Sequence, residues 1–315
     1  YDEDGTGYLD ANVVRAIADK VAKTGTNLWY TATSEELLAG IELPESWQGK
    51  TLKAGTDTLD VWIDSGSSHF AVLTKHDDLK WPCDLYLEGS DQHRGWFQSS
   101  LWTGIIREGV APYKKILTHG FIVNQDGTKL SKSEGAMTLE HYMDKYGADI
   151  VRLWIASTDF RNDVSMGEEI LKTTSDAYRL VRNTLRFQIS NLFDFEIQKH
   201  GMPTQELHDI DRWALDKAAV LAEACEYAYE NYEFHRVYQL CNQFCSVTLS
   251  ALYHDILKDR LYTLAENHPT RRSSQTAIYH IFRTLVRVLG PVLPFTADEA
   301  WSYFLADKDF VDDSL

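Results

Sequence analysis

Two lysines placed three residues apart are the first feature of this sequence that could do chemistry. Lys129 and Lys132 lie in the stretch DGTKLSKSEG, residues 126–135, among small residues that include Ser131. Lysine ammonium groups are compact charges that can bind phosphate oxygens, and serine and glycine neighbours add hydroxyl and backbone donors. Phosphoryl and nucleotidyl transfer need such charges to stabilise a transition state with developing negative charge. As composition alone, however, a basic surface turn is equally ordinary.

A second stretch, YLEGSDQHRGWF at residues 86–97, combines carboxylates, an amide and glycine. Glu88, Asp91 and Gln92 can accept hydrogen bonds from sugar hydroxyls or an ammonium group, while Gly89 lets a ligand approach the backbone closely. The free N–H groups at the start of the helix that should follow add a place for negative charge. The alternative is an ordinary helix N-cap, with Glu88 in a surface salt bridge.

Two tryptophans form a third candidate feature. Trp62 lies inside the predicted strand 57–64, and Trp96 lies on the first turns of the predicted helix after Gln92. Both could therefore flank one pocket near the strand ends, sized for a small apolar side chain. Because the chain holds nine tryptophans, the competing interpretation is that both belong to the core.

Three predicted strands must position these groups, at residues 57–64, 84–89 and 113–123. Between the last two, apolar residues recur at helical spacing and Gly109 stands where a helix C-cap is expected. Such a strand–helix–strand unit should be parallel and right-handed, with ligands bound beyond the carboxyl ends of its strands. The third strand brings His119 and Gly120 to that edge. A helix over 10–24 and a short extended piece are expected before the first strand.

From about Ser165 the pattern changes to long amphipathic helices. They are expected at 168–194, 211–230, 233–264 and 273–289, with a last helix after Pro291 and Pro294. Capping-box spacing predicts two of the starts, at Ser165 with Glu168 and at Thr296 with Glu299. The predicted fold class is therefore α/β over residues 1–165, followed by an all-α bundle over residues 166–315.

Composition limits the function classes. The net charge of −16 argues against a general nucleic-acid coat. A local basic face remains possible at Arg179, Arg182 and Arg186, which fall at i, i+3 and i+7 of a predicted helix, and at the neighbours Arg271 and Arg272. Ion pairs on a solvated face are an equally good interpretation of both.

Segments that cross membranes or bind metal are not expected. No apolar run approaches the roughly 18 residues that span a bilayer, and the first residues do not resemble a signal peptide. None of the four cysteines has CxxC spacing, so reduced core thiols are expected rather than a zinc site. We expect a soluble, cytoplasmic protein.

The motifs together resemble one family. The stretches 57–70, 85–101, 117–135 and 147–159 occur in the order and approximate spacing of class I aminoacyl-tRNA synthetases. Within that class the sequence of these motifs is most similar to the isoleucyl enzymes of bacterial type, because EGSDQHRGWF at 88–97 favours them over valyl and leucyl relatives. The helical half resembles the anticodon-binding bundle of the same family. The resemblance implies a Rossmann-like parallel sheet, of which this chain holds the second half.

Residue roles follow from this resemblance by position. KLSKS at 129–133 matches the KMSKS signature, which makes Lys132 the residue that contacts the ATP phosphates and stabilises pyrophosphate departure, with Lys129 assisting. Trp62 and Trp96 match the walls of the isoleucine pocket. The helix with three arginines becomes a candidate tRNA contact. The resemblance implies an ATP- and adenylate-binding set of Glu88, Gly89, Asp91, Gln92, His119, Gly120, Ser131 and Lys132.

The implied reaction is activation of L-isoleucine with ATP, as its Mg²⁺ complex, and transfer to tRNA(Ile). No zinc is implied in this part of the family's sequence. The second class I signature, HIGH, is missing, since no His-x-Gly-His occurs in the sequence. We therefore expect an internal or truncated piece that lacks the N-terminal half and the editing domain and is inactive alone. A non-catalytic tRNA-binding module is the alternative; a kinase-like ATP user is weakened because no GxxxxGK[ST] loop is present.

Overall fold

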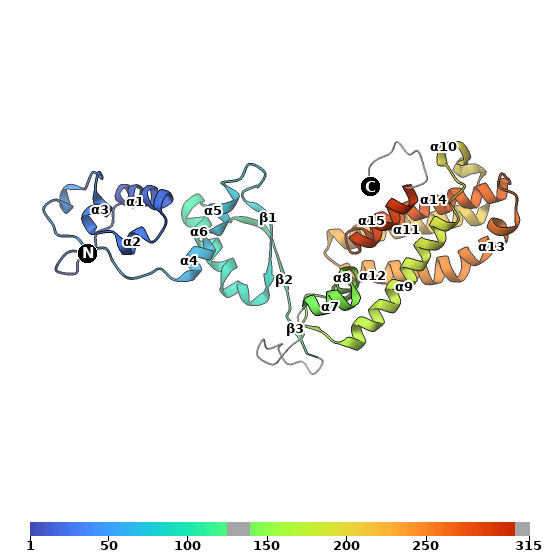
Figure 1. Ribbon diagram of the computed structural model, residues 1–315, viewed down its shortest axis with the longest axis horizontal. Coiled ribbons are helices and arrows are strands. Elements are labelled where there is room, and N and C mark those ends of the chain that lie inside the picture. The colour runs from blue at the N-terminus through green and yellow to red at the C-terminus, as the bar shows by residue number, and fades with distance from the viewer. Residues whose placement is uncertain (125–138, 306–315) are drawn as a thin grey trace. The chain divides into compact units, whose positions relative to one another are not determined.

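The computed structural model describes residues 1–124 and 139–305 (Figure 1). The chain forms two compact units. Tyr1–Cys83 and Arg94–Pro112 make the first, and Asp84–His93 and the chain from Tyr113 onwards make the second. The lysine stretch 126–135, with Lys129, Ser131 and Lys132, lies outside the described residues.

The first unit begins with the helix predicted over 10–24. Helix α1 spans Ala11–Thr24, and the Asp10 side chain caps it by accepting from the N–H groups of Asn12 and Val13. The expectation of an extended piece after this helix is wrong, because Leu28–Thr31 forms the short helix α2. Helix α3 (Ser34–Leu38) and a 3₁₀ turn (Glu45–Trp47) follow.

The predicted strand 57–64 is also wrong. Residues Val61–Gly66 form helix α4, and Ser68–Leu73 form helix α5. Branched and aromatic residues suggested a strand, but the Asp60 carboxylate accepts from the Trp62 N–H at 2.8 Å and starts a helix. Helix α4 packs on α6 (Trp96–Glu108). Gly66 permits this contact, since a Cβ there would lie 2.8 Å from Ser99.

The predicted strand–helix–strand unit is confirmed. Strand β1 (Cys83–Gly89) pairs with β2 (Tyr113–His119), and α6 connects them along the chain. Cys83 N–H donates to the Pro112 carbonyl, and Asp84 pairs with Lys114 at 2.6 Å, so the strands start side by side and run parallel. Gly109 ends α6 at a φ of 75°, as predicted for a C-cap glycine.

The third predicted strand, 113–123, divides at Gly120. Residues Ile122–Val123 form β3, which pairs in parallel with β4 (Val164–Ser165) instead of continuing the first sheet. Helices α7 (Leu139–Tyr146) and α8 (Ala148–Ser157), which the sequence pattern did not predict, lie between β3 and β4 in the chain.

The all-α part is confirmed, with shifted bounds (Figure 1). The predicted helix 233–264 is a continuous run in which a π-helical segment, Phe244–Tyr253, separates α12 from α13. The bounds of the α-helices are α9 Glu168–Ser190, α10 Ile197–His200, α11 Asp209–Glu230, α12 Phe234–Gln243, α13 His254–Thr263, α14 Pro269–Leu289 and α15 Pro294–Leu305. No described helix is both long and apolar enough to cross a membrane.

Neither predicted capping box forms. Ser165 lies in β4, and the Glu168 carboxylate instead accepts from Lys145 at 2.7 Å. Helix α15 begins two residues before Thr296, whose N–H donates to Asp149 at 2.7 Å. In both places a partner distant in sequence takes the group that local capping would have used.

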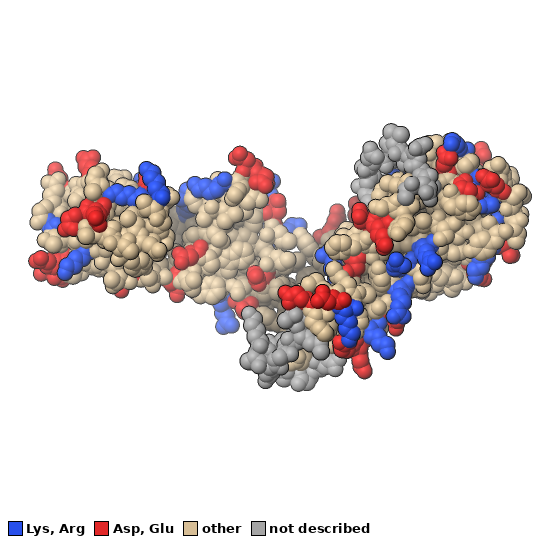
Figure 2. Space-filling view, viewed as in Figure 1, with Lys and Arg blue, Asp and Glu red and all other residues tan. Residues whose placement is uncertain are grey.

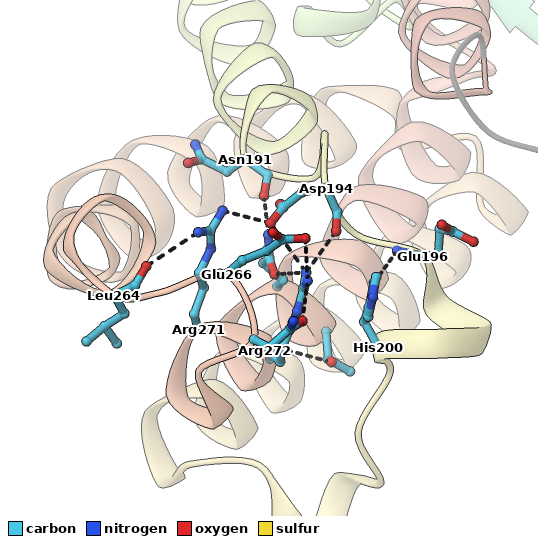
Figure 3. Close-up of polar contacts among 11 residues, drawn as sticks. Asn191, Asp194, Glu196, His200, Leu264, Glu266, Arg271 and Arg272 are labelled. Carbon is cyan, nitrogen blue, oxygen red and sulfur yellow. Dashed lines mark hydrogen bonds and ion pairs between the residues drawn. The ribbon is translucent and has the colours of Figure 1, made fainter.

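Two buried polar networks hold α14 to its neighbours. In the first, Asp211 is fully buried and accepts from Tyr253 at 2.7 Å and from Ser273 at 2.6 Å. In the second, Asp194 follows α9 and binds two arginines at the start of α14 (Figure 3). Arg271 approaches its carboxylate at 2.9 Å, and Arg272 donates to its backbone carbonyl at 2.9 Å.

These contacts correct one expectation from the sequence. Arg271 and Arg272 do not form an exposed RNA-binding face, because their side chains are only 12% and 6% exposed. Their charges are satisfied by Asp194 and by neighbouring carbonyl and amide oxygens. The ion-pair interpretation is the right one for this pair.

Removing Asp194 should therefore be costly. Asp194→Ala leaves two buried guanidinium groups without their shared carboxylate, which we expect to lower the free energy of unfolding by about 3–5 kcal/mol. Asp176→Ala is the matched control, because its ion pair with Arg179 is more than half exposed and should contribute at most about 1 kcal/mol. Urea titration followed by circular dichroism measures both; equal losses would contradict the network's role.

Candidate functional site

The carboxyl end of β1 carries Glu88, Gly89, Asp91 and Gln92, which the sequence predicted as a ligand-binding stretch and which are called the acidic corner below. Gly89 ends the strand, and a 3₁₀ turn over Ser90–Arg94 begins immediately after it. Gly89 is buried, and a Cβ at this position would lie 2.7 Å from Asp91 Oδ1. Its N–H donates to the Glu88 carboxylate at 3.1 Å. The strand end therefore presents two carboxylates beside a glycine whose missing side chain lets Asp91 and Phe121 pack against it.

The end of β2 lies beside this corner. The Phe121 ring lies 3.3 Å from where a Cβ on Gly89 would be. His119 Nδ1 lies 2.7 Å from its neighbour's carbonyl, that of Gly120. A Cβ on Gly120 would lie 2.3 Å from the backbone of Asn162, so only glycine fits there. The structure thus brings Glu88, Gly89, Asp91, Gln92, His119 and Gly120 to one edge of the second unit.

The two acidic side chains of this corner are exposed to solvent. Glu88 and Asp91 are exposed, and neither forms an ion pair with any described residue. Gln92 Nε2 lies 3.4 Å from Asp91 Oδ2. Carboxylates in this state are acceptors for hydroxyl or ammonium groups of a ligand. In the first unit and the described part of the second, no three His, Cys, Asp or Glu side chains are grouped to hold a metal ion.

Trp62 and Trp96 lie in the first unit, on the packed helices α4 and α6. Trp62 is 43% exposed. The Trp96 indole N–H donates to the Ser65 carbonyl at 2.9 Å and lies 3.3 Å from Ser68 Oγ. Trp96 therefore ties α6 to the junction of α4 and α5, while Trp62 keeps a free surface. In the same unit, buried His69 accepts from Trp81 Nε1 at 3.0 Å, and burial lowers the pKa of this histidine.

The three arginines of α9 lie on its exposed side, and Figure 2 shows basic side chains gathered along this helix. Arg179 pairs with Asp176 at 2.9 Å, and Arg182 approaches Glu299 of α15 at 3.7 Å. Arg186 makes no ion pair with a described residue. The ion-pair interpretation therefore fits Arg179 best, and the ligand-binding interpretation fits Arg186 best, with Arg182 between them.

Arg182 and Arg186 line an open groove of about 530 Å³ between α9 and α15. Two aromatic side chains of its wall are strongly exposed, Phe193 at 73% and Tyr303 at 67%. Cationic and aromatic groups side by side suit phosphate and base contacts of RNA. Phe193 and Tyr303 could not be predicted from the sequence as one wall, because no local pattern relates residues more than a hundred positions apart.

Two family models match long stretches of this chain. A family model described as tRNA synthetases class I (I, L, M and V) matches residues 1–167, and one described as the anticodon-binding domain of tRNA ligase matches residues 211–314. A protein named isoleucine–tRNA ligase from Methylacidiphilum infernorum is 50% identical over 301 residues, which cover 96% of this chain and 33% of that protein. Its namesake from Legionella pneumophila strain Corby is 47% identical over 290 residues, covering 92% and 30%. The chain thus spans about a third of the length of these curated relatives.

Two solved structures share the fold. A LeuRS from Agrobacterium radiobacter K84, in ternary complex with tRNA and LeuAMS, has a TM-score of 0.63 at 16% identity and covers 84% of this chain and 34% of its own. Methionyl-tRNA synthetase from Mycobacterium tuberculosis, in complex with methionyl-adenylate, has a TM-score of 0.59 at 20% identity and covers 77% and 49%.

The corner itself predicts the effect of a single methyl group. Gly120→Ala places a Cβ against the Asn162 backbone, which cannot move aside as a side chain could, so we expect a loss of about 1–3 kcal/mol in unfolding free energy. Gly290→Ala is the control, because its Cβ would approach the Val286 carbonyl only to 3.3 Å at an ordinary helical φ of −50°. It should change stability by less than about 1 kcal/mol. Similar losses for both, measured by urea unfolding, would refute the close approach.

Proposed function

The chain belongs to the class I tRNA synthetases of the isoleucine, leucine, methionine and valine group, and we propose that it is a segment of an isoleucine–tRNA ligase. In this proposal residues 1–165 are catalytic and residues 166–315 form the anticodon-binding bundle. The whole enzyme would activate L-isoleucine with ATP and transfer it to tRNA(Ile). The observation that carries the proposal is the 50% identity with an isoleucine–tRNA ligase over 96% of this chain.

The acidic corner supports the activation step. We propose that Glu88 and Asp91, with Gln92, accept hydrogen bonds from the ammonium group and the ribose hydroxyls of the adenylate, which Gly89 also helps to hold. His119 and Gly120 would border the adenine. These groups bind and orient the reactants, so that activation needs no covalent enzyme intermediate. Trp62 and Trp96 are proposed to wall the isoleucine side chain.

The phosphate end of the reaction is assigned to the lysine stretch. ATP as its Mg²⁺ complex is the substrate, and Lys132, Lys129 and Ser131 would meet its phosphates and stabilise the departing pyrophosphate. In the acidic corner, carboxylates suit the adenylate's donors but repel phosphates. In this proposal the lysine stretch binds the phosphates, and the acidic corner binds the ribose and the ammonium group. A role in charging tRNA for protein synthesis implies a cytoplasmic location.

The activation step predicts a negative result for the chain alone. No His-x-Gly-His sequence is present to act opposite Lys132. We therefore expect little or no isoleucine-dependent exchange of pyrophosphate into ATP by the 315-residue chain, measured with labelled pyrophosphate at saturating isoleucine. Exchange well above a Lys132→Ala control would mean that the phosphates need nothing opposite the lysine stretch.

The groove between α9 and α15 predicts RNA binding. In filter binding with tRNA(Ile), Arg182→Ala and Arg186→Ala should each weaken the complex and reduce the salt slope by about one. Arg179→Ala should have less effect, because its charge is already paired with Asp176. Arg236→Ala is the control, since it lies on α12 and pairs with Glu233. Absence of binding, or equal effects for Arg186 and Arg236, would remove this surface from the proposal.

A further inference from the structure

Helix α8 is a wall shared by two apolar clusters of the second unit. Two of its side chains belong to the core of the helical bundle, Leu153 and Ala156. Its other buried apolar side chains belong to a second cluster, which joins α7, β4 and the start of α9, namely Ile150, Val151 and Trp154. A helix buried on both sides cannot shift without disturbing both clusters. α8 therefore links the bundle to the β3–β4 pair.

Polar contacts fix the first turns of α8 to the start of α15 and to the residues just before it. The Asp149 carboxylate is 7% exposed and accepts from both the N–H of Thr296, at 2.7 Å, and its hydroxyl, at 2.5 Å. One turn later, Arg152 donates to the carbonyls of Val292 at 3.0 Å and Pro291 at 2.8 Å. These four hydrogen bonds join residues about 140 positions apart. The two pairs are called the α8 clamp below.

The other end of α8 leads directly to the candidate site. The chain leaves α8 at Ser157 and forms the wall against which Gly120 packs. Gly120 N–H donates to the Phe160 carbonyl at 2.8 Å, and Phe121 N–H donates to the Asp163 carboxylate at 2.8 Å. A displacement of α8 would therefore move the backbone that holds the end of β2 in place.

We propose that Asp149 and Arg152 are positioning residues, which act through α8 to set the Gly120 edge of the acidic corner from the helical bundle. The first step is energetic. A carboxylate as buried as that of Asp149 is costly without donors, and the Thr296 N–H and hydroxyl are the two donors that it has among the described residues. The α8 clamp therefore holds α15 and α8 in one relative position.

The α8 clamp also reaches the groove between α9 and α15. Thr296 lines this groove, as does Glu299 one turn further along α15, which Arg182 approaches at 3.7 Å. A phosphate bound at Arg182 would compete with Glu299 and so act on the helix that carries Thr296. The clamp thus gives the groove and the corner a common rigid path. This part rests on the proposed function, whereas the clamp itself does not.

Hydrogen–deuterium exchange on the full 315-residue chain, without ligand, tests the clamp. Thr296→Val removes the hydroxyl but keeps the backbone N–H. We expect exchange of the Gly120, Val164 and Met166 amides to accelerate about three- to tenfold, as for loss of one or two buried hydrogen bonds. Thr296→Ser should restore the wild-type rates, because it returns the hydroxyl that Asp149 needs.

Thr174→Val is the matched control. Thr174 is also a buried threonine of the second unit, but its hydroxyl donates only to the Ile170 carbonyl of its own helix. It should leave the three amides within about twofold of wild type. Unchanged rates in Thr296→Val, equal acceleration in Thr174→Val, or failure of Thr296→Ser to restore the rates would each overturn the proposal. Because no ligand is used, failure of the proposed enzymatic function would leave this result standing.

Discussion

The burial of helix α8 between two apolar clusters is the constraint on which the second unit depends. Six of its ten residues are buried, including Trp154 with no exposed surface. Burying a large apolar side chain stabilises a fold by about 1.5–3 kcal/mol. The buried apolar side chains of α8 together therefore contribute more to stability than any single polar contact around the helix. The polar contacts have a different effect. Asp149 and Arg152 select one position among those that burial alone would allow.

The candidate site follows from where the backbone can come close. Gly89 lets the Asp91 carboxylate and the Phe121 ring lie close to the end of β1, and Gly120 lets the end of β2 lie against the Asn162 backbone. In the proposed function, the exposed carboxylates would bind donor groups of the adenylate at the corner, and the exposed arginines of α9 would bind acceptor groups of RNA in the groove.

The sequence predicted the elements whose signals are local. Strand β1, helix α6 and the cap at Gly109 were predicted because branched and aromatic residues, helical spacing and a C-terminal glycine are signals that occur within a few residues. Helix α4 was missed because Val61, Trp62 and Ile63 favour a strand, whereas the Asp60 cap and the Gly66–Ser99 contact favour a helix. The π-helical segment 244–253 has no sequence signature and lies inside a predicted helix.

Pairings across long sequence distances could not be predicted from local patterns. Arg271 and Arg272 looked like a basic patch, and only the fold brings Asp194 between them. Likewise, Thr296 had the spacing of a cap but pairs with Asp149, which lies 147 positions earlier in the chain. Glu88 and its neighbours lie at the end of β1, as predicted, because they follow one strand locally, and their binding role stays a prediction. The lysine stretch stays a prediction, since it lies outside the described residues.

The most direct measurement replaces the corresponding third of the Methylacidiphilum infernorum isoleucine–tRNA ligase with this chain and follows isoleucine-dependent exchange of pyrophosphate into ATP. We predict exchange close to that of the unmodified relative, its loss on Lys132→Ala, and a preference for isoleucine over valine of about 10–200-fold. A folded chimera without exchange, or one that prefers leucine or valine, would contradict the assignment of this chain to an isoleucine-activating enzyme.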